Sequence, residues 1–201
     1  MSLSRRHVVG MAIVAVIMVI AAMGGPERLR AYAEGDGGCS ASNRIPTPAA
    51  LEQARAATLC LLNRERAAQG LPALVMDARL TQASQLHSDD MGRRDFYAHE
   101  NPDGLGPSPR VYAQGLPPDG TTVAENIHWG TGWLATPKEI VRDWMDSPGH
   151  RRNILRAEVS HVGVGIGFDA PRPGHRGQAR VYATNFFGSD DAGLPRPLPS
   201  G

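Results

Sequence analysis

Three short segments of the sequence place a polar side chain able to do chemistry beside apolar anchors. They are F-Y-A-H ending at His99, A-E-N-I around Glu125, and S-P-G-H-R-R-N-I-L around His150. In the third, a Pro-Gly pair forces a turn just before the histidine. An imidazole held on such a turn can bind a metal ion or carry a proton. Each group alone is more often structural, and we expect all three segments to lie in loops.

Helices must position these segments. The first is expected to begin with Thr47 as N-cap and Pro48 at its first position, and to end at Gly70. A second begins after Asp77, its N-cap, and carries inward-facing residues every three or four positions as far as Met91.

The middle of the chain alternates between loop and helix signals. Residues 94–122 are rich in Pro and Gly, with one short helix expected over 111–116, and such a long irregular stretch is usually functional or disordered. Thr136–Glu139 then forms a capping box with proline at the first helical position. The helix that it opens must end near Ser147.

Alternation of period two predicts two strands near the C-terminus, over 162–168 and 181–187, joined by a mobile Pro/Gly-rich loop. Helices followed by such an antiparallel hairpin predict an α+β domain of about 135 residues. We place it at 51–188, after a flexible tail at 34–50 and before a disordered tail at 189–201.

The N-terminus has the composition of an export signal rather than of the fold. Arg5 and Arg6 precede an apolar run from Val8 to Met23, and an A-Y-A cleavage site ends at Ala33. Residues 1–33 are therefore a signal peptide, of Sec or twin-arginine type, or a retained N-terminal anchor. Either alternative places the domain outside the cytoplasm, and a retained anchor is the expected membrane contact.

Charge and cysteines narrow the function classes. The chain has 21 basic and 20 acidic residues. Removing residues 1–33 takes away four arginines and one glutamate, which leaves 17 basic and 19 acidic residues. No basic face for a nucleic-acid partner is indicated. Cys39 and Cys60 can form one disulfide in an oxidising compartment; the alternative is two unpaired thiols.

In combination, these segments resemble the CAP superfamily (cysteine-rich secretory proteins, insect venom antigens and plant pathogenesis-related proteins), in its short bacterial secreted branch. The resemblance covers roughly residues 52–188. It rests on the following ordered matches: Asn63-x-x-Arg66, His99, A-E-N-I at 124–127 for the family's G-E-N-I, W-M-D-S-P-G-H-R-R-N-I-L at 144–155, V-G-V-G at 162–165, and Y-A-T-N-F at 182–186.

The resemblance implies a three-layer α-β-α sandwich with a central antiparallel sheet and a cleft lined by two His and two acidic residues. His99, Glu125 and His150 carry over. The fourth position, three residues beyond Trp144, is Ser147 here, with Asp146 just before it. Adjacent helical side chains point about 100° apart, so Asp146 and Ser147 are alternative fourth groups.

Two imidazoles and one carboxylate suit Zn²⁺ or another divalent cation, and an open coordination position can activate water. No H-E-x-x-H is present, since His99-Glu100 is followed by N-P-D. The alternative is that Glu125 hydrogen-bonds one histidine and orients the loops without any cofactor.

A hydrolase would also need a nucleophile. The chain has no G-x-S-x-G, Cys60 is expected to be bridged, and Ser147 is expected to cap the turn at Pro148. Binding needs less, because aromatic side chains on loops around a polar cleft can hold lipid, sterol or glycan. The candidates are Tyr112, Trp129 and Trp133, whereas Trp144 is expected in the core.

The sequence thus predicts an exported protein of the bacterial envelope or medium. Its partner would be a small hydrophobic or glycan ligand, or an envelope component. The alternative function is a metal-assisted or serine-type hydrolase, acting on peptide or cell wall, that uses the same cleft with His99, Glu125 and His150 as catalytic residues.

Overall fold

A computed structural model describes residues 38–172, 177 and 179–189. The expected leader at 1–33 and nearly all of the expected C-terminal tail lie outside these residues. The chain divides into Met1–Gly38 and Cys39–Gly201, and all described residues except Gly38 belong to the second unit. In the described ranges, no helix combines the length and apolar character needed to cross a membrane.

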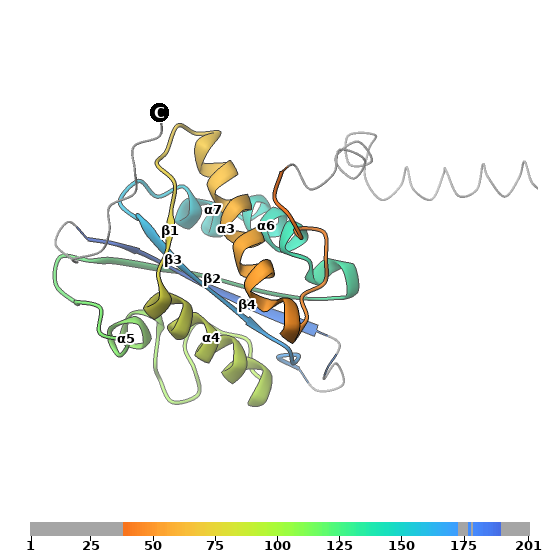
Figure 1. Cartoon of the computed structure of the whole chain (residues 1–201). Coiled ribbons are helices and arrows are strands. Elements are labelled where there is room, and N and C mark those ends of the chain that lie inside the picture. The colour runs from red at the N-terminus through yellow and green to blue at the C-terminus, as the bar shows by residue number, and fades with distance from the viewer. Residues whose placement is uncertain (1–37, 173–176, 178, 190–201) are drawn as a thin grey trace, which may run out of the picture. The chain divides into compact units, whose positions relative to one another are not determined.

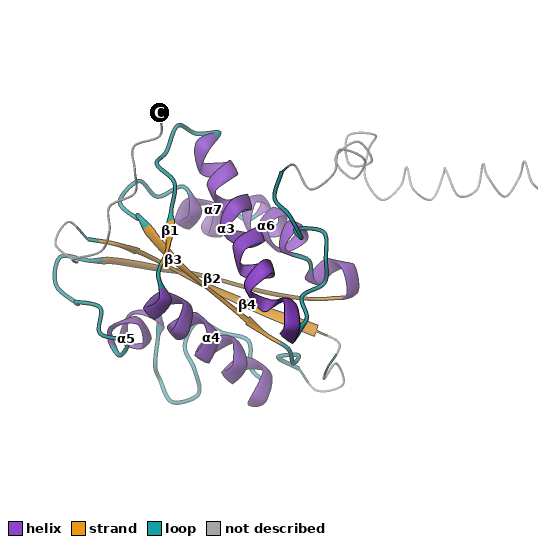
Figure 2. Ribbon diagram, viewed as in Figure 1, coloured by secondary structure: helices purple, strands orange, loops and turns teal. Residues whose placement is uncertain are grey.

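The second unit is the expected α-β-α sandwich (Figures 1 and 2). Helices α4 (Ala78–Arg93) and α5 (Pro107–Tyr112) cover one face of the sheet, and α3 (Leu51–Ala67), α6 (Pro137–Asp146) and α7 (Pro148–Ile154) cover the other. The strands run in the order β1-β3-β4-β2. Their bounds are β1 Val75–Met76, β2 Thr122–Thr131, β3 His161–Gly167 and β4 Ala179–Gly188.

The sheet differs in one respect from the expected antiparallel one. Strands β3 and β4 pair antiparallel, as the hairpin pattern predicted, and β2, which was not predicted, pairs antiparallel to β4; β1 pairs parallel to β3. The sheet is therefore mixed. The difference arises because the two-residue β1 lies in the connection between α3 and α4, where no alternating pattern signals a strand.

Glycines on β3 set the distance between α4 and the sheet. A Cβ added at Gly163 would lie 2.0 Å from the backbone of Leu80, and one at Gly165 would lie 2.2 Å from the backbone of Ser84. The helix backbone therefore rests directly on the strand, which only glycine permits. The intervening side chains, including Val162 and Val164, are fully buried in the main core on the other face.

Two of the four expected helix caps form. Asp77 accepts hydrogen bonds from the amides of Arg79 (2.8 Å) and Leu80 (3.1 Å). The Thr136 hydroxyl accepts a long one from the Glu139 amide (3.5 Å), while the Thr136 amide donates to Trp133 O rather than completing the box.

The caps expected at Thr47 and Ser147 were wrong. Neither side chain makes a capping bond, although each stands at an N-cap position. The first helix instead begins with a short 3₁₀ turn, η1 (Pro48–Ala50), before α3. The short helix expected over 111–116 begins earlier, at Pro107, because proline is tolerated in a first helical turn where no amide bond is needed.

The segment expected to be a flexible tail at 34–50 is fixed to the domain in its described part. Cys39 forms a disulfide with Cys60 of α3, as predicted, with 5.6 Å between their Cα atoms. Lys138 N donates to Ser42 O (3.0 Å), and Arg180 Nε donates to Pro46 O (2.7 Å). These long-range contacts override the loop-like composition.

Candidate functional site

The candidate site is built around β2, which is an edge strand of the sheet. An edge strand presents backbone groups that no neighbouring strand pairs, and here side chains take two of them. The carbonyl of Ile127 accepts from Tyr97 Oη (3.0 Å) and Trp144 Nε1 (3.2 Å). The carbonyl of Glu125 accepts from Asn153 Nδ2 (3.1 Å). Tyr97 belongs to the loop after α4, Trp144 to α6 and Asn153 to α7. These bonds therefore attach elements from both faces of the sheet to the same edge strand.

Glu125 lies on β2 and not in a loop as expected. Its buried side chain, 1% exposed, is held by two donors. Its Oε1 lies 2.8 Å from Nδ1 of His99, and its Oε2 accepts from Nη2 of Arg110 at 2.7 Å. The predicted pairing of Glu125 with a histidine is therefore present, and the histidine is His99.

Arg110 fixes both members of that pair. Besides Glu125, its Nη1 donates to the carbonyls of His99 (2.8 Å) and Leu105 (2.5 Å). The His99 side chain remains half exposed, and its Nε2 has no partner in the described part of the chain. Because Glu125 holds Nδ1, Nε2 is the atom that His99 offers to a ligand.

A further imidazole beside Glu125, the fully buried His87 of α4, was missed by sequence reasoning as a site residue. Its Nε2 donates to Ala98 O at 3.0 Å and lies 3.8 Å from Glu125 Oε1. Desolvation lowers the His87 pKa, with the Glu125 charge opposing that shift, so the ring is neutral. The available signal was a histidine at an inward position of the predicted helix.

His150 reaches the same edge from α7. Asn126, whose side chain alternates with that of Glu125 to the other face, donates to His150 O (3.1 Å) and accepts from Asn153 (2.9 Å). The His150 side chain is partly buried. Burial lowers its pKa, and the charges of His99 and His128 lower it further, so three imidazoles influence one another here.

The acidic group that α6 directs toward this side is Asp143. Its Oδ2 lies 3.2 Å from Nε2 of His128 on β2, and its charge opposes the lowering of the His128 pKa by burial. Of the two expected fourth groups, Asp146 is exposed and Ser147 is partly buried, with no capping bond from its side chain. Asp143 lies inside α6, whereas Ser147 follows the helix with an extended backbone, so no helical spacing from the motif pointed to Asp143.

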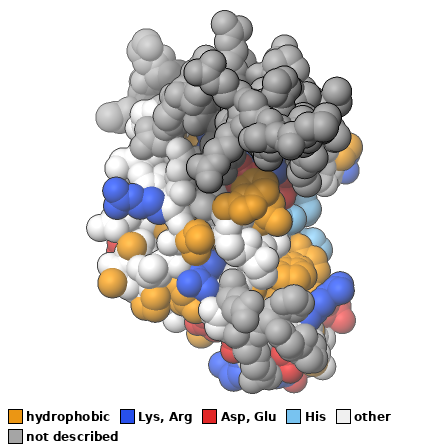
Figure 3. Space-filling model, turned by 90° about the vertical axis from the view of Figure 1, so that its right-hand side faces the viewer, with side chains coloured by type: hydrophobic (Ala, Val, Ile, Leu, Met, Phe, Trp, Pro, Cys, Tyr) orange, Lys and Arg blue, Asp and Glu red, His pale blue; other side chains and the backbone are white. Residues whose placement is uncertain are grey.

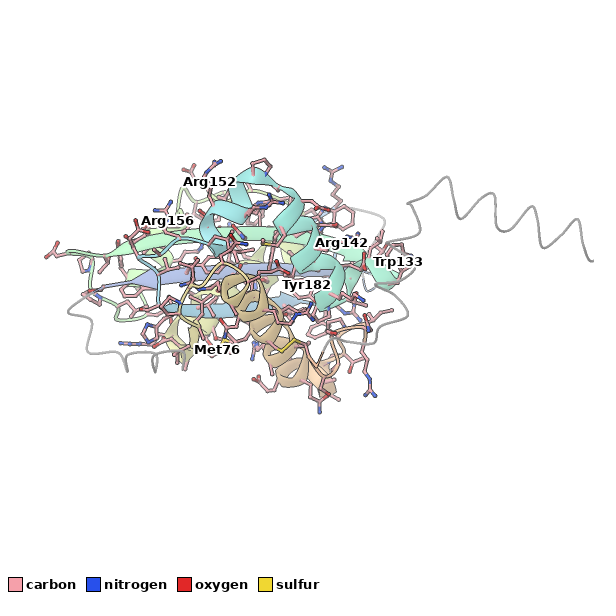
Figure 4. All side chains as sticks on the ribbon, turned by 90° about the horizontal axis from the view of Figure 1, so that it is seen from above. Met76, Trp133, Arg142, Arg152, Arg156 and Tyr182 are labelled. Carbon is pink, nitrogen blue, oxygen red and sulfur yellow. A yellow bond between two sulfur atoms is a disulfide. The ribbon has the colours of Figure 1, made fainter. Side chains whose placement is uncertain are left out.

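The three aromatic residues expected around the cleft do not form one wall. Tyr112 packs on the α5 side against the cluster of Leu80 and Phe187, and Trp129 packs with Ile127. Trp133 is 53% exposed, but it lies in the turn η2 (Gly132–Ala135) that follows β2, whose end at Thr131 is roughly 20 Å along the strand from Glu125. Figure 4 shows Trp133 at one end of the described domain.

The site does not fit the predicted three-ligand metal centre. Both oxygens of Glu125 already have partners, and one partner is the guanidinium of Arg110, a fixed positive charge that would repel a cation at that carboxylate. Over the described ranges, no group of three His, Cys, Asp or Glu side chains is arranged to hold a metal ion. The groups that remain for a ligand at this edge are the imidazoles of His99, His128 and His150; Figure 3 shows histidine side chains at one edge of the molecule.

Comparison with known proteins agrees with this architecture. The model of the cysteine-rich secretory protein (CAP) family matches residues 59–184. The protein YkwD of Bacillus subtilis, which is uncharacterized, is 37% identical over 105 residues, covering 52% of this chain and 39% of its own length. The chain thus spans about two fifths of that relative.

Two solved structures share the fold. An extracellular protein of Bacillus anthracis that contains an SCP domain has a TM-score of 0.56 and 22% identity, covering 72% of this chain and 44% of its own. An outer surface protein of Borrelia burgdorferi has a TM-score of 0.54 and 15% identity, covering 66% and 90%. The family model, matching well over half of the sequence, confirms the predicted resemblance: the chain belongs to the CAP family of cysteine-rich secretory proteins.

Proposed function

We propose that this CAP domain is an exported binding protein of the bacterial envelope or medium, and that it holds a small ligand in the cleft at the β2 edge. The observation that carries the proposal is the buried Glu125–Arg110 pair, which fixes the half-exposed His99 side chain through Nδ1 and leaves Nε2 as its available atom. A preorganised hydrogen-bonding group of this kind binds with little ordering cost. Export is supported by the N-terminal pattern and by the disulfide.

The ligand class follows from the polarity of the cleft. His99 and His150 present imidazole nitrogens, and the pKa of His150 is lowered by burial, so His150 is a neutral donor or acceptor near pH 7. Since Tyr112, Trp129 and Trp133 form no common wall, we assign these imidazoles to the polar part of a ligand: glycan hydroxyls or the head group of a lipid or sterol. The partner could equally be an envelope component that carries such groups.

Hydrolysis is the second candidate, because an imidazole oriented by a buried carboxylate also has the arrangement of a general base. A serine-type reaction would need a hydroxyl close to His99. Within the described residues, no serine hydroxyl hydrogen-bonds His99, His128 or His150. The His99–Glu125 pair favours this function, but a binding site explains the same pair with fewer parts.

The proposal is tested on the full-length protein produced with its leader and purified from membranes and medium. Mass spectrometry of extracted ligand should detect a glycan or lipid with the wild type and lose it with His99→Ala and His150→Ala. Trp133→Ala, remote from the cleft, should retain the ligand. Equal amounts of ligand on all four proteins would overturn the proposal. Turnover of peptide or peptidoglycan that is lost in both histidine variants would establish the hydrolase instead.

Zinc provides a separate test of the same cleft. With Arg110 on Glu125, we expect zinc to raise the melting temperature of the wild type little. In Arg110→Gln the carboxylate is released as a ligand, so zinc should raise the melting temperature of that variant more, through preferential binding to the native state. Adding His150→Ala should remove the increase. A large zinc shift in the wild type would show that Arg110 does not block the site.

A further inference from the structure

The turn that follows β2 holds two large apolar side chains at the surface. Trp133 is 53% exposed and Leu134 39%, whereas the next residue, Ala135, is fully buried. All three belong to η2, between the edge strand and α6. Single exposed apolar residues are common on protein surfaces and need no explanation. A neighbouring pair does call for one when the backbone beneath it is fixed.

The backbone of this turn is held by the strands below it. The carbonyl of Ala135 accepts a hydrogen bond from the buried Tyr182 Oη (2.9 Å) of β4. A Cβ added at Gly130 would lie 2.4 Å from the carbonyl oxygen of Leu134, so the turn folds back directly onto β2. The fold therefore fixes the turn that carries the two exposed side chains. A contact made through them needs little further ordering of the backbone.

The segment through which the chain enters the domain is fixed at the same end. Its Ser42 carbonyl accepts a hydrogen bond from the amide of Lys138 (3.0 Å), in the first turn of α6 and shortly after η2. Arg44 and Ile45 follow Ser42 and are both exposed, Ile45 by 44%. This end of the domain thus presents three large apolar side chains and a positive charge.

The apolar run near the N-terminus joins the domain at this end. The uncharged stretch from Val8 to Met23 is separated from Cys39 by residues 24–38. Cys39 lies one turn before Ser42, whose amide it accepts (3.2 Å), and its disulfide fixes it to α3. With the run retained as a membrane anchor, Cys39 stays within about 60 Å of the bilayer, because an extended chain spans at most about 3.6 Å per residue. Such a tether gives this end a high effective concentration of membrane, so that weak contacts suffice.

We propose that this end of the domain, formed by Trp133, Leu134 and Ile45, rests on the surface of a phospholipid bilayer. A tryptophan ring suits the interface because it is largely apolar and its N–H can stay hydrogen-bonded among the head groups. Leu134 and Ile45 add apolar contact, and Arg44 adds attraction to anionic lipid. The contact rests on the export proposed above with the leader retained, and it is independent of the ligand at the β2 edge.

Tryptophan fluorescence tests the proposal on the full-length protein. The protein is reconstituted in vesicles of phosphatidylcholine and phosphatidylglycerol and isolated with them by flotation. Residues 1–38 contain no tryptophan, so quenching by lipids with brominated acyl chains reports contact of the domain alone. The wild type should be quenched, and Trp133→Phe should lose the larger part of that quenching. Trp129→Phe should keep it, because Trp129 is partly buried.

Two leucines provide a matched control. Leu134→Ser should reduce the quenching of Trp133, whereas Leu86→Ser, at a leucine that is 49% exposed on α4, should leave it unchanged. An unquenched wild type, equal quenching in Trp133→Phe, or protein that fails to float would each overturn the proposal. Trp133 that is shielded from acrylamide but not quenched by brominated lipid would identify a second copy of the chain as the occupant, and would overturn it too. None of these outcomes bears on ligand retention at the β2 edge.

Discussion

Replacing Arg110 by methionine is the most direct test of how the site is held together. Arg110 and Glu125 are 9% and 1% exposed at the side chain, and 2.7 Å separates their closest charged atoms. Removing one partner of such a buried pair leaves the other charge uncompensated, which costs about 3–5 kcal/mol. Three of the hydrogen bonds that fix His99, Leu105 and Glu125 are lost in the same step.

The measurement is urea unfolding followed by tryptophan fluorescence, together with thermal unfolding. For a chain of this size the expected loss lowers the melting temperature by about 6–20 °C, at about 2–4 °C per kcal/mol. Arg93→Met is the matched control: it removes an exposed ion pair with Asp90 and should cost about 1 kcal/mol or less.

The double variant Arg110→Met, Glu125→Gln separates charge from packing. If the cost comes from an uncompensated carboxylate, a neutral amide at position 125 should recover a large part of it. A loss below about 1 kcal/mol in Arg110→Met would refute the buried pair. No recovery in the double variant would show instead that the contacts of Arg110 to the two carbonyls carry the stability.

Three other outcomes are expected. Gly165→Ala would place a Cβ 2.2 Å from the backbone of Ser84, so that α4 must move away from β3. It should lower the free energy of unfolding, measured in urea, by about 3 kcal/mol or more. An unchanged free energy of unfolding would contradict the close packing. Reducing the Cys39–Cys60 disulfide, which spans 21 residues, should lower the free energy of unfolding by about 3 kcal/mol. The measurement compares unfolding with and without dithiothreitol. No difference between the two would mean that the crosslink does not constrain the unfolded chain. Burial lowers the pKa of His87. Below about pH 6.5 the unfolded chain therefore binds more protons than the folded one, and the free energy of unfolding falls as the pH is lowered. His87→Phe should make that decrease smaller, and an unchanged pH dependence would argue against a neutral buried ring.

Much of the fold could be predicted because local signals and tertiary packing agree. Asp77 and the alternation of valine and glycine over 162–167 each specify one local structure, and both are found. The prediction failed where tertiary contacts decide. Residues 39–46 have the composition of a tail, yet a disulfide and two long-range hydrogen bonds hold them. Strand β2 was not predicted from the sequence. Polar side chains lie on both of its faces, so its sequence lacks the alternation of apolar and polar residues that indicates a strand.

The partners of the site residues were harder to foresee than the residues themselves. Arg110 and Asp143 contact Glu125 and His128 across 15 residues each, and no periodicity links a short helix in a Pro-rich stretch to a strand. His87 fits an inward helical position, and that pattern does not distinguish a core histidine from one beside a carboxylate. Motif reasoning therefore named His99 and Glu125, which the structure brings together, and missed Arg110, His87 and Asp143, which lie against Glu125 or His128.

The geometry of β2 explains why three consecutive residues, Glu125, Asn126 and Ile127, organise the whole site. Successive side chains of a strand point to opposite faces, so Glu125 binds His99 on one face while Asn126 binds the backbone of His150 on the other. The carbonyls of Glu125 and Ile127 point outward from the edge and take donors from Asn153, Tyr97 and Trp144. A strand inside the sheet could not do this, because its neighbours would occupy those carbonyls. The segments that carry His99 and His150 therefore bind the same strand, one from each face, because that strand is an edge.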